Sequence, residues 1–323
     1  MNNPKNCLDI TNLENLSTQL QNFIKTEVTQ NLKKKGVIVG LSGGIDSSVT
    51  SVLSKYSLGY ENIFGLILPE KESSPESMTL ANLLSKKFNI QTEVIDITEI
   101  LSAFGVYTIR ENIVQKYFPS FNDNCKYGLS VSNQSVLKGG LRIPILQIKD
   151  EKNSIHKFRL THDDFAKLYS ATSIKHRTRM TLLYFFAEQK NFAVLGSTNK
   201  SEYIQGYFVK YGDGGVDLEP IQNLFKTQVY QLGNFLEIPQ EIIDRKASPD
   251  TWSFEVSDEE FFYGIDYKTL DLLWYAKENN FSLDDIEKLV GYDRTQIENL
   301  LLYLEKRWNS TSHMRNLPPS LKI

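Results

Sequence analysis

Cysteine and histidine are scarce in this sequence of 323 residues, which contains two cysteines and four histidines. Cys7 and Cys125 are too far apart to form a redox or zinc-binding pair, which favours a reducing compartment. The histidines also lack metal-ligand spacing; they are His156, His162, His176 and His313. The sequence therefore carries no signature of a disulfide scaffold or of a zinc site.

Long apolar runs and a strong charge of one sign are absent as well. The chain has no run of about 18 apolar residues, and its N-terminal Met-Asn-Asn-Pro-Lys lacks a signal-peptide core. The formal net charge is −3, so bulk charge gives no reason to expect a nucleic-acid or membrane partner. Local basic residues would have to bind an anionic substrate. We expect a soluble, cytoplasmic protein.

The most informative stretch, residues 37–48, reads Val-Ile-Val-Gly-Leu-Ser-Gly-Gly-Ile-Asp-Ser-Ser. A β-branched run passes directly into a glycine-rich turn and then into a helical pattern. Such an arrangement presents backbone N–H groups and a helix N-terminus to phosphates. The spacing fits neither a Walker A loop nor a dinucleotide fingerprint. We predict a phosphate-binding loop over Gly40–Ser47, and a turn without a ligand is the structural alternative.

Strand-like and helical patterns alternate along much of the chain, which predicts an α/β fold with a doubly wound, mainly parallel sheet flanked by helices. Ligands bind such sheets at the carboxyl ends of the strands, where the glycine-rich loop lies. We expect the helix over 163–189 to be interrupted near 170–173, and a helical C-terminal appendage over 257–323. The predicted strands are 37–41, 63–68, 92–97 and 192–195, and the other predicted helices are 10–35, 46–55 and 75–88.

Residues 105–160 interrupt this alternation. The stretch 117–128 is rich in Asn, Pro and aromatic residues, and a short strand containing a proline is indicated after Gly139-Gly140. We interpret the region as an atypical insertion within a single domain of residues 1–323. It either shapes a substrate site or covers an edge of the sheet.

A second informative block, residues 194–226, contains a polar, glycine-rich loop between apolar segments. Lys210 supplies a cation to this loop, and Asp213 and Asp217 supply carboxylates. Glycines at 212, 214 and 215 allow the backbone to approach a ligand closely. An ordinary surface loop seldom has this composition, so we predict a binding role.

Both blocks resemble enzymes that activate carboxylates with ATP. Ser-Gly-Gly-Ile-Asp-Ser is similar to the pyrophosphate loop of the N-type ATP pyrophosphatases. Gly-Ser-Thr-Asn-Lys-Ser-Glu-Tyr and Gly-Tyr-Phe-Val-Lys-Tyr-Gly-Asp-Gly-Gly-Val-Asp are similar to the ammonia-dependent NAD synthetase family. The similarity extends to Ile174–Tyr184, Ala247–Trp252 and His313–Pro319. The resemblance implies an adenine nucleotide alpha-hydrolase-like fold and a homodimer.

In that family, the carboxylate of nicotinic acid adenine dinucleotide attacks the α-phosphate of ATP and pyrophosphate leaves. Ammonia then displaces AMP to form the amide of NAD. The resemblance therefore implies ATP, this dinucleotide and ammonia as substrates, and Mg²⁺ as the cofactor. A glutamine-dependent enzyme needs a glutaminase with a cysteine nucleophile, and neither Cys7 nor Cys125 lies in a suitable motif. We expect free ammonia, or ammonia from a separate chain, as the nitrogen donor.

The resemblance also implies roles for individual residues. Asp46 and Glu202 are expected to bind Mg²⁺, whose usual ligands are carboxylate and phosphate oxygens. The expected catalytic residues are Asp46, Lys210 and Asp213. The expected ATP-binding residues are Gly40, Leu41, Ser42, Gly43, Gly44, Ile45, Asp46, Ser47, Ser197, Lys226 and Ser248. The expected dinucleotide-binding residues are Arg177, Lys210, Asp217, His313 and Met314.

Structural roles stay open for several of these positions. Without the resemblance, Glu202 and Lys226 are equally well explained as solvated helix residues. Arg177 and Arg179 point to different faces of a helix, so only one of them is expected to reach a ligand. His176, which lies between them, is expected to be structural or solvated.

Two departures from the family pattern leave a second function open. Ser173 stands where the family has Asn, and Met314 stands where it has Lys. The alternative is a paralogue that uses the same adenylation chemistry to amidate another carboxylate, such as a sugar acid.

The C-terminal part contains a segment, 281–301, with the apolar spacing of a helix-turn-helix. Its second helix, 293–306, is close to neutral rather than basic, so we interpret the segment as a helical pair packed on the core and not as a DNA-binding module. Upstream of it, Ser257-Asp258-Glu259-Glu260 has capping-box spacing, which predicts the start of a helix there.

Overall fold

A parallel sheet forms the centre of the fold in the computed structural model, which describes residues 7–131, 137, 143–254 and 256–321. The sheet has the order β3-β2-β1-β7, and all three pairings within it are parallel. Its strands are β1 (Val37–Gly40), β2 (Ile63–Ile67), β3 (Gln91–Val94) and β7 (Ala193–Leu195). The predicted α/β class is confirmed, and each predicted strand is present with somewhat shorter bounds.

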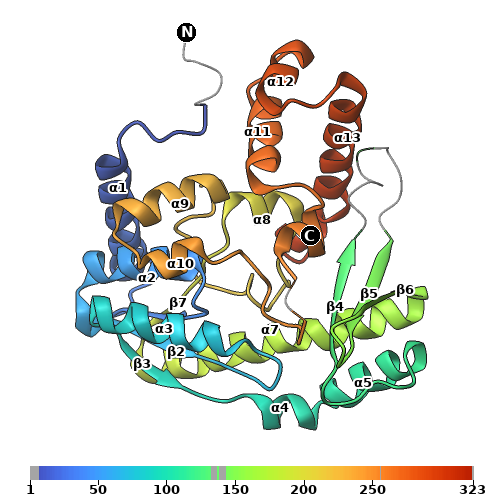
Figure 1. The fold of residues 1–323 in the computed structure, drawn as a ribbon. Coiled ribbons are helices and arrows are strands. Elements are labelled where there is room, and N and C mark those ends of the chain that lie inside the picture. Colours follow the sequence, from blue (N-terminus) through green and yellow to red (C-terminus); the bar gives the residue numbers. More distant parts are fainter. Residues whose placement is uncertain (1–6, 132–136, 138–142, 255, 322–323) are drawn as a thin grey trace.

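Helices cover both faces of this sheet (Figure 1). Val37 and Val39 of β1 point to one face, and Ile38 points to the other, as expected for successive residues of a strand. The first face packs against α1 (Leu13–Thr26), the π-helical turn Glu27–Asn31, α2 (Ile45–Leu58), α3 (Pro75–Phe88), α9 (Lys226–Phe235) and α10 (Gln240–Asp244). The second face packs against α4 (Thr98–Ala103), the start of α5 (Val106–Tyr117) and α7 (His162–Lys190). A short 3-10 turn, Tyr60–Asn62, leads into β2.

Helix α7 is continuous over 29 residues, so the interruption expected near 170–173 is wrong. The polar residues that suggested a break bond back to the helix itself. Ser170 donates to the carbonyl of Lys167 at 2.9 Å, and Thr172 donates to that of Leu168 at 2.9 Å. Such back-bonding satisfies the hydroxyls without ending a helix.

Residues 105–160 build a second sheet rather than extending the first. The antiparallel strands β4 (Lys126–Val131), β5 (Pro144–Lys149) and β6 (Ile155–Arg159) pair in sequence order. Leu129, Leu146 and Ile148 form a core of their own together with Leu168 of α7 and with Trp252. Within the described residues, neither edge strand of the parallel sheet, β3 or β7, pairs with this second sheet.

The C-terminal part is helical, as predicted, and forms a third packing unit (Figure 1). It comprises the π-helical turn Glu259–Tyr263, α11 (Tyr267–Glu278), α12 (Leu283–Val290), α13 (Arg294–Ser310) and α14 (Ser312–Arg315). Ile286 of α12 and Ile297 and Leu300 of α13 are buried against Leu273 of α11, in a core that also takes in Ile204 of α8 (Lys200–Gln205). The interpretation of 281–301 as a packed helical pair is thereby confirmed. None of the helices in the described ranges is long and apolar enough to cross a bilayer.

Candidate active site

A cavity of about 350 Å³ opens at the carboxyl ends of β1, β2 and β7. Its size falls within the usual range for small-molecule sites. It is lined by Gly40 at the end of β1, Ile67 at the end of β2 and Leu195 at the end of β7, together with the loops that follow them. The position is the one expected for a ligand of a doubly wound sheet.

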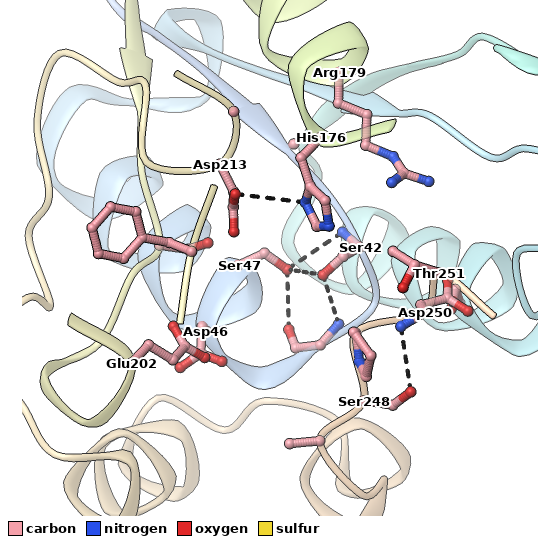
Figure 2. Close-up of a pocket in the computed structure, with 18 of the residues that line it drawn as sticks. Ser42, Asp46, Ser47, His176, Arg179, Glu202, Asp213, Ser248, Asp250 and Thr251 are labelled. Atoms are coloured by element: carbon pink, nitrogen blue, oxygen red, sulfur yellow. Dashed lines mark hydrogen bonds and ion pairs between the residues drawn. The ribbon is translucent and has the colours of Figure 1, made fainter. Parts of the chain in front are cut away.

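The glycine-rich loop forms one wall of this cavity (Figure 2). Gly43 has a φ of 74°, and a Cβ there would lie 2.4 Å from the carbonyl oxygen of Ser77, so only glycine fits. The loop is organised by the hydroxyls of Ser42 and Ser47, which lie 3.0 Å apart. No side chain caps the start of α2 at Gly44. The first N–H groups of α2 are therefore available to an anion.

Three charged side chains from separate helices converge beside the loop. Asp46 lies in the first turn of α2, Glu202 lies in the first turn of α8, and Lys226 begins α9. The Lys226 ammonium forms an ion pair with Asp46 Oδ2 and lies 3.8 Å from Glu202 Oε1. Only 2% of the Lys226 side chain is exposed, which contradicts the solvated alternative for this residue.

The electrostatics of this group follow from one buried cation between carboxylates. Burial raises the pKa of Glu202 well above its usual value, and the neighbouring Asp46 adds to the effect while Lys226 opposes it. Burial alone would lower the pKa of Lys226, but Asp46 and Glu202 outweigh it and raise the pKa. The site therefore holds an excess of negative charge that a further cation would relieve.

The donor set fits a magnesium ion bound together with a polyphosphate. Asp46 and Glu202 offer carboxylate oxygens at the phosphate-binding loop, and Mg²⁺ is commonly held by one or two carboxylates plus substrate phosphates. Among the described residues, no group of three or more His, Cys, Asp or Glu side chains could hold a metal by itself. Such a site would depend on the nucleotide to complete the coordination.

The remaining walls bring together other residues predicted from the sequence. Ser197, Asp213 and Ser248 all line the cavity. Figure 2 shows Asp213 facing His176, and the carboxylate Oδ1 lies 3.6 Å from the imidazole Nδ1. Burial lowers the pKa of His176, and Asp213 opposes this shift. His176 thus belongs to the cavity wall rather than to a solvated surface.

Five predicted dinucleotide contacts lie outside the lining of this cavity: Arg177, Lys210, Asp217, His313 and Met314. Lys210 donates from Nζ to the carbonyls of His313 at 2.7 Å and Asn316 at 3.1 Å, so Lys210 lies against the C-terminal tail that contains His313. Asp217 accepts a 2.7 Å hydrogen bond from the backbone N–H of Val194 in β7, the strand that pairs with β1. Their assigned substrate contacts stay predictions.

Arg179, not Arg177, lies in the cavity wall. Its Nε donates to the carbonyl of Leu68 at 3.1 Å, whereas the Arg177 guanidinium lies 3.5 Å from the carbonyl of Lys210. Only Arg179 of the two lines this cavity, and which of them reaches a ligand stays a prediction. Helical spacing separates their faces but does not say which face meets the cavity.

Two further residues at the site had no functional assignment from the sequence. Asn199 is fully buried, and its side-chain amide donates to Asp46 Oδ1 at 2.9 Å while its oxygen accepts from the backbone N–H of Glu202. The Asn199-x-x-Glu202 spacing is a capping box, and that signal was available in the sequence.

The helix start predicted at Ser257–Glu260 is confirmed, but the sequence did not indicate that Asp258 also lines the cavity. Ser257 and Glu260 form the capping-box contacts, whereas Asp258 is buried and lines the cavity. Its carboxylate accepts hydrogen bonds from the hydroxyls of Tyr207 at 2.7 Å and Tyr267 at 2.9 Å. Burial raises the pKa of Asp258. No local sequence signal marks these partners, because Tyr207 lies 51 residues away.

Sequence comparison decides the family. The family model for NAD synthase matches residues 16–127 and 132–318. The chain belongs to the NAD synthase family. A curated relative from Rhizobium meliloti (strain 1021), named NH(3)-dependent NAD(+) synthetase, is 35% identical over 293 residues, which are 90% of this chain and 87% of the relative. The resemblance drawn from the glycine-rich loop and the 194–226 block is confirmed.

Solved structures of NAD synthases and of a related enzyme share this fold. The NMN synthetase of Francisella tularensis aligns with a TM-score of 0.67 at 23% identity and covers 97% of this chain and 100% of that one. The NH3-dependent NAD synthetase of Campylobacter jejuni subsp. jejuni NCTC 11168 aligns with a TM-score of 0.64 at 23% identity and the same coverage. At this identity the likeness shows the fold, and it confirms the predicted fold class.

Proposed function

We propose that this NAD synthase is a ligase that amidates nicotinic acid adenine dinucleotide to NAD, with ammonia as the nitrogen donor and ATP cleaved to AMP and pyrophosphate. The observation that carries the proposal is the convergence of Asp46, Glu202 and Lys226 at the glycine-rich loop. Family membership and the name of the curated relative support the same reaction. They do not favour the sugar-acid alternative.

In the first step, the substrate carboxylate attacks the α-phosphorus of ATP and pyrophosphate leaves with the electrons of the broken P–O bond. Negative charge grows on the leaving oxygen. The N–H groups at the start of α2 and the buried ammonium of Lys226 are the chain's own groups that stabilise this charge. A bound Mg²⁺, held by Asp46 and Glu202, would supply further neutralisation of the phosphates.

In the second step, ammonia attacks the acyl carbon of the mixed anhydride, AMP leaves, and one proton is released. The anhydride must be kept from water, and the cavity walls formed by Trp252, Phe261 and Tyr169 are aromatic. Asp213 is the residue that we assign to the neighbourhood of the ammonia. We also propose the homodimer that the family resemblance implies, which light scattering of the purified protein tests directly.

The decisive experiment measures AMP and pyrophosphate release with ATP, Mg²⁺ and ammonia. Release should depend on nicotinic acid adenine dinucleotide and should be abolished by Asp46→Ala and by Glu202→Ala. Asp163→Ala is a matched control, because it removes a carboxylate from an exposed ion pair with Lys167 on α7. Glutamine in place of ammonia should give no turnover with this chain alone.

The acceptor is settled by comparing carboxylates in the same assay. Nicotinic acid mononucleotide and sugar acids serve as competing acceptors. No release of AMP and pyrophosphate with the dinucleotide, together with release when a sugar acid is supplied, would support the sugar-acid alternative instead. Loss of activity in Asp163→Ala as large as in Asp46→Ala would contradict the assigned site.

A further inference from the structure

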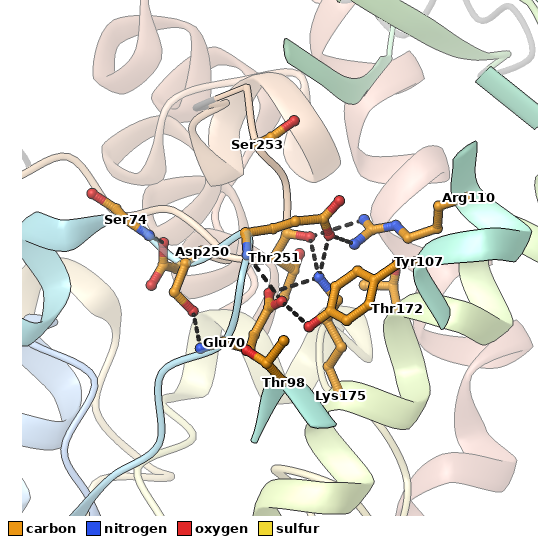
Figure 3. A network of polar contacts seen from close by, with 12 residues as sticks. Glu70, Ser74, Thr98, Tyr107, Arg110, Thr172, Lys175, Asp250, Thr251 and Ser253 are labelled. Carbon is orange, nitrogen blue, oxygen red and sulfur yellow. Dashed lines mark hydrogen bonds and ion pairs between the residues drawn. The ribbon is translucent and has the colours of Figure 1, made fainter. Parts of the chain in front are cut away.

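A buried ionic cluster lies behind one wall of the cavity (Figure 3). Its members come from four separate parts of the fold: the loop after β2, helix α5, strand β4 and helix α7. We define the cluster as Glu70, Glu72, Tyr107, Arg110, Tyr127 and Lys175. The side chains of Lys175, Arg110 and Glu70 are 0% exposed, so the centre of the cluster is fully buried.

The charges within the cluster balance. Lys175 Nζ lies 2.7 Å from Glu70 Oε1 and 2.5 Å from Glu72 Oε2, and the Arg110 guanidinium also pairs with Glu72. The hydroxyl of Tyr107 donates to Glu70 at 2.7 Å. Two cations and two carboxylates thus satisfy one another, and only well-partnered charges persist at full burial.

Both cations also hold the same backbone carbonyl. Arg110 Nη2 donates to the Thr251 oxygen at 2.8 Å, and Lys175 Nζ donates to it at 3.1 Å. Thr251 belongs to the segment Ser248–Trp252, which lines the cavity. The Arg110 guanidinium in addition lies 3.9 Å from the centroid of the Trp252 ring.

Within the segment Ser248–Trp252 the Asp250 N–H donates to the Ser248 hydroxyl at 3.3 Å, and further polar contacts reach the segment from outside it. The Thr251 hydroxyl and the Trp252 indole N–H are both buried and have no hydrogen-bond partner among the described residues. Asp250 has a φ of 46°, in the left-handed region, and accepts hydrogen bonds from the Ser74 N–H and the Ser77 hydroxyl. The position of this wall therefore depends on groups outside it.

The antiparallel sheet supplies a second attachment directly after the segment. The Phe254 N–H donates to the Tyr127 carbonyl at 2.9 Å, and the Tyr127 N–H donates to the Ser253 hydroxyl at 3.0 Å. Trp252 itself is part of the core beneath this sheet. The 105–160 region thus contacts the wall through Arg110, and through backbone hydrogen bonds it contacts the residues that directly follow the wall.

We propose that the 105–160 region, acting with Lys175 through the buried ionic cluster, is a positioning element that fixes the Ser248–Trp252 wall of the nucleotide cavity. Arg110, Lys175 and Tyr127 act on the wall and not on the reacting atoms, so they are positioning residues. This gives the insertion a role in shaping the site, one of the two that the sequence left open. The kinetic part of the test rests on the proposed function.

The test variant is the double substitution Lys175→Met with Glu70→Gln, which removes one charge of each sign. The measurement is hydrogen exchange of backbone amides, followed by mass spectrometry on the protein without ligands. Exchange should be about tenfold faster in a peptide covering 248–254, because the Thr251 carbonyl loses a charged donor. Exchange in β1 and β7 should be unchanged. KM for ATP should rise about tenfold, and kcat should fall by a smaller factor.

The matched control is Lys116→Met, which breaks an α5–α7 ion pair with Asp164 that does not touch the wall. It should leave exchange in 248–254 and KM for ATP unchanged. If the double variant does not fold, Tyr127→Phe and Ser253→Ala keep every charge and should show the same local effect at smaller size. Unchanged exchange in 248–254, or equal acceleration in β1, would overturn the inference. Inactive wild-type protein would refute the proposed function but leave the exchange result intact.

Discussion

Replacing Lys226 by Met removes the one cation that contacts both Asp46 and Glu202 within the described structure. The side chains of these carboxylates are only 16% and 17% exposed, and burial already disfavours the charge on Glu202. Removing one partner of a buried ion pair typically costs about 3–5 kcal/mol, since the other charge is left uncompensated. We expect a loss of this size in the free energy of unfolding near neutral pH.

The loss should depend on pH with a defined sign. In the variant, Glu202 no longer has Lys226 to lower its pKa, so its native-state pKa lies even further above that of the unfolded chain. The native state then binds more protons than the unfolded state as pH falls below neutrality, and stability rises on acidification. The deficit relative to wild type should therefore be largest at about pH 8 and smaller at about pH 5.5.

Urea unfolding followed by circular dichroism, without nucleotide, measures both effects. Lys200→Met is the control, because it breaks a more exposed pair, Lys200–Glu278, and should cost less than about 1 kcal/mol. Activity of Lys226→Met should fall on the order of 10²–10³-fold, as for loss of one transition-state charge contact. Equal losses of stability in the two variants, or a deficit that does not change with pH, would refute the reasoning.

Three other outcomes follow from the same structure. Gly43 has a φ of 74°, and a Cβ there would lie 2.4 Å from Ser77 O, so Gly43→Ala should lower the free energy of unfolding in urea by more than about 2 kcal/mol and should weaken ATP binding. Gly105 has a φ of 71° but faces open space, so Gly105→Ala should lower it by only about 1–2 kcal/mol. Asp217→Ala should cost about 1–2 kcal/mol by leaving the Val194 N–H unpaired; unchanged stability in urea would contradict this role. Burial and Arg110 lower the pKa of Lys175 to about 8, against Glu72 and Glu70. The unfolded chain keeps this proton to about pH 10.4, so the native state loses it first as pH rises. The free energy of unfolding should therefore increase by about 2 kcal/mol from about pH 7 to about pH 9.5, and the variant without Lys175 should lack this increase.

The sequence predicts the parallel sheet and its phosphate loop well because the signals are local. Val37, Ile38 and Val39 alternate between two buried faces, and the glycines that follow are required by backbone geometry. The carboxyl-end rule then brings Ser197 and the Asp46 loop to one cavity without further information. Periodicity, turn chemistry and topology all agree here, so the prediction needed no tertiary detail.

The remainder depends on contacts between distant residues. Lys226 is buried and Glu202 is largely shielded because the starts of α8 and α9 meet Asp46 of α2, and no pattern within either helix predicts this contact. Asp258 differs from an ordinary residue at a helix start only because the hydroxyls of Tyr207 and Tyr267 donate hydrogen bonds to its carboxylate. Strand β5 matches the proline-containing strand that the sequence indicates, but the antiparallel sheet as a whole escaped prediction because its packing partners include Trp252, far along the chain.

The shared core of the antiparallel sheet and Trp252 has a consequence for recombination between members of the family. A chimera that exchanges residues 105–160 alone would separate Arg110 from the carbonyl it holds at Thr251. The crossover unit is therefore discontinuous: 105–160 must travel with 248–254 and with Glu70, Glu72 and Lys175 to keep a matched set. Enzymes with loops of other lengths in this region should be interchangeable only when all of these pieces come from the same parent.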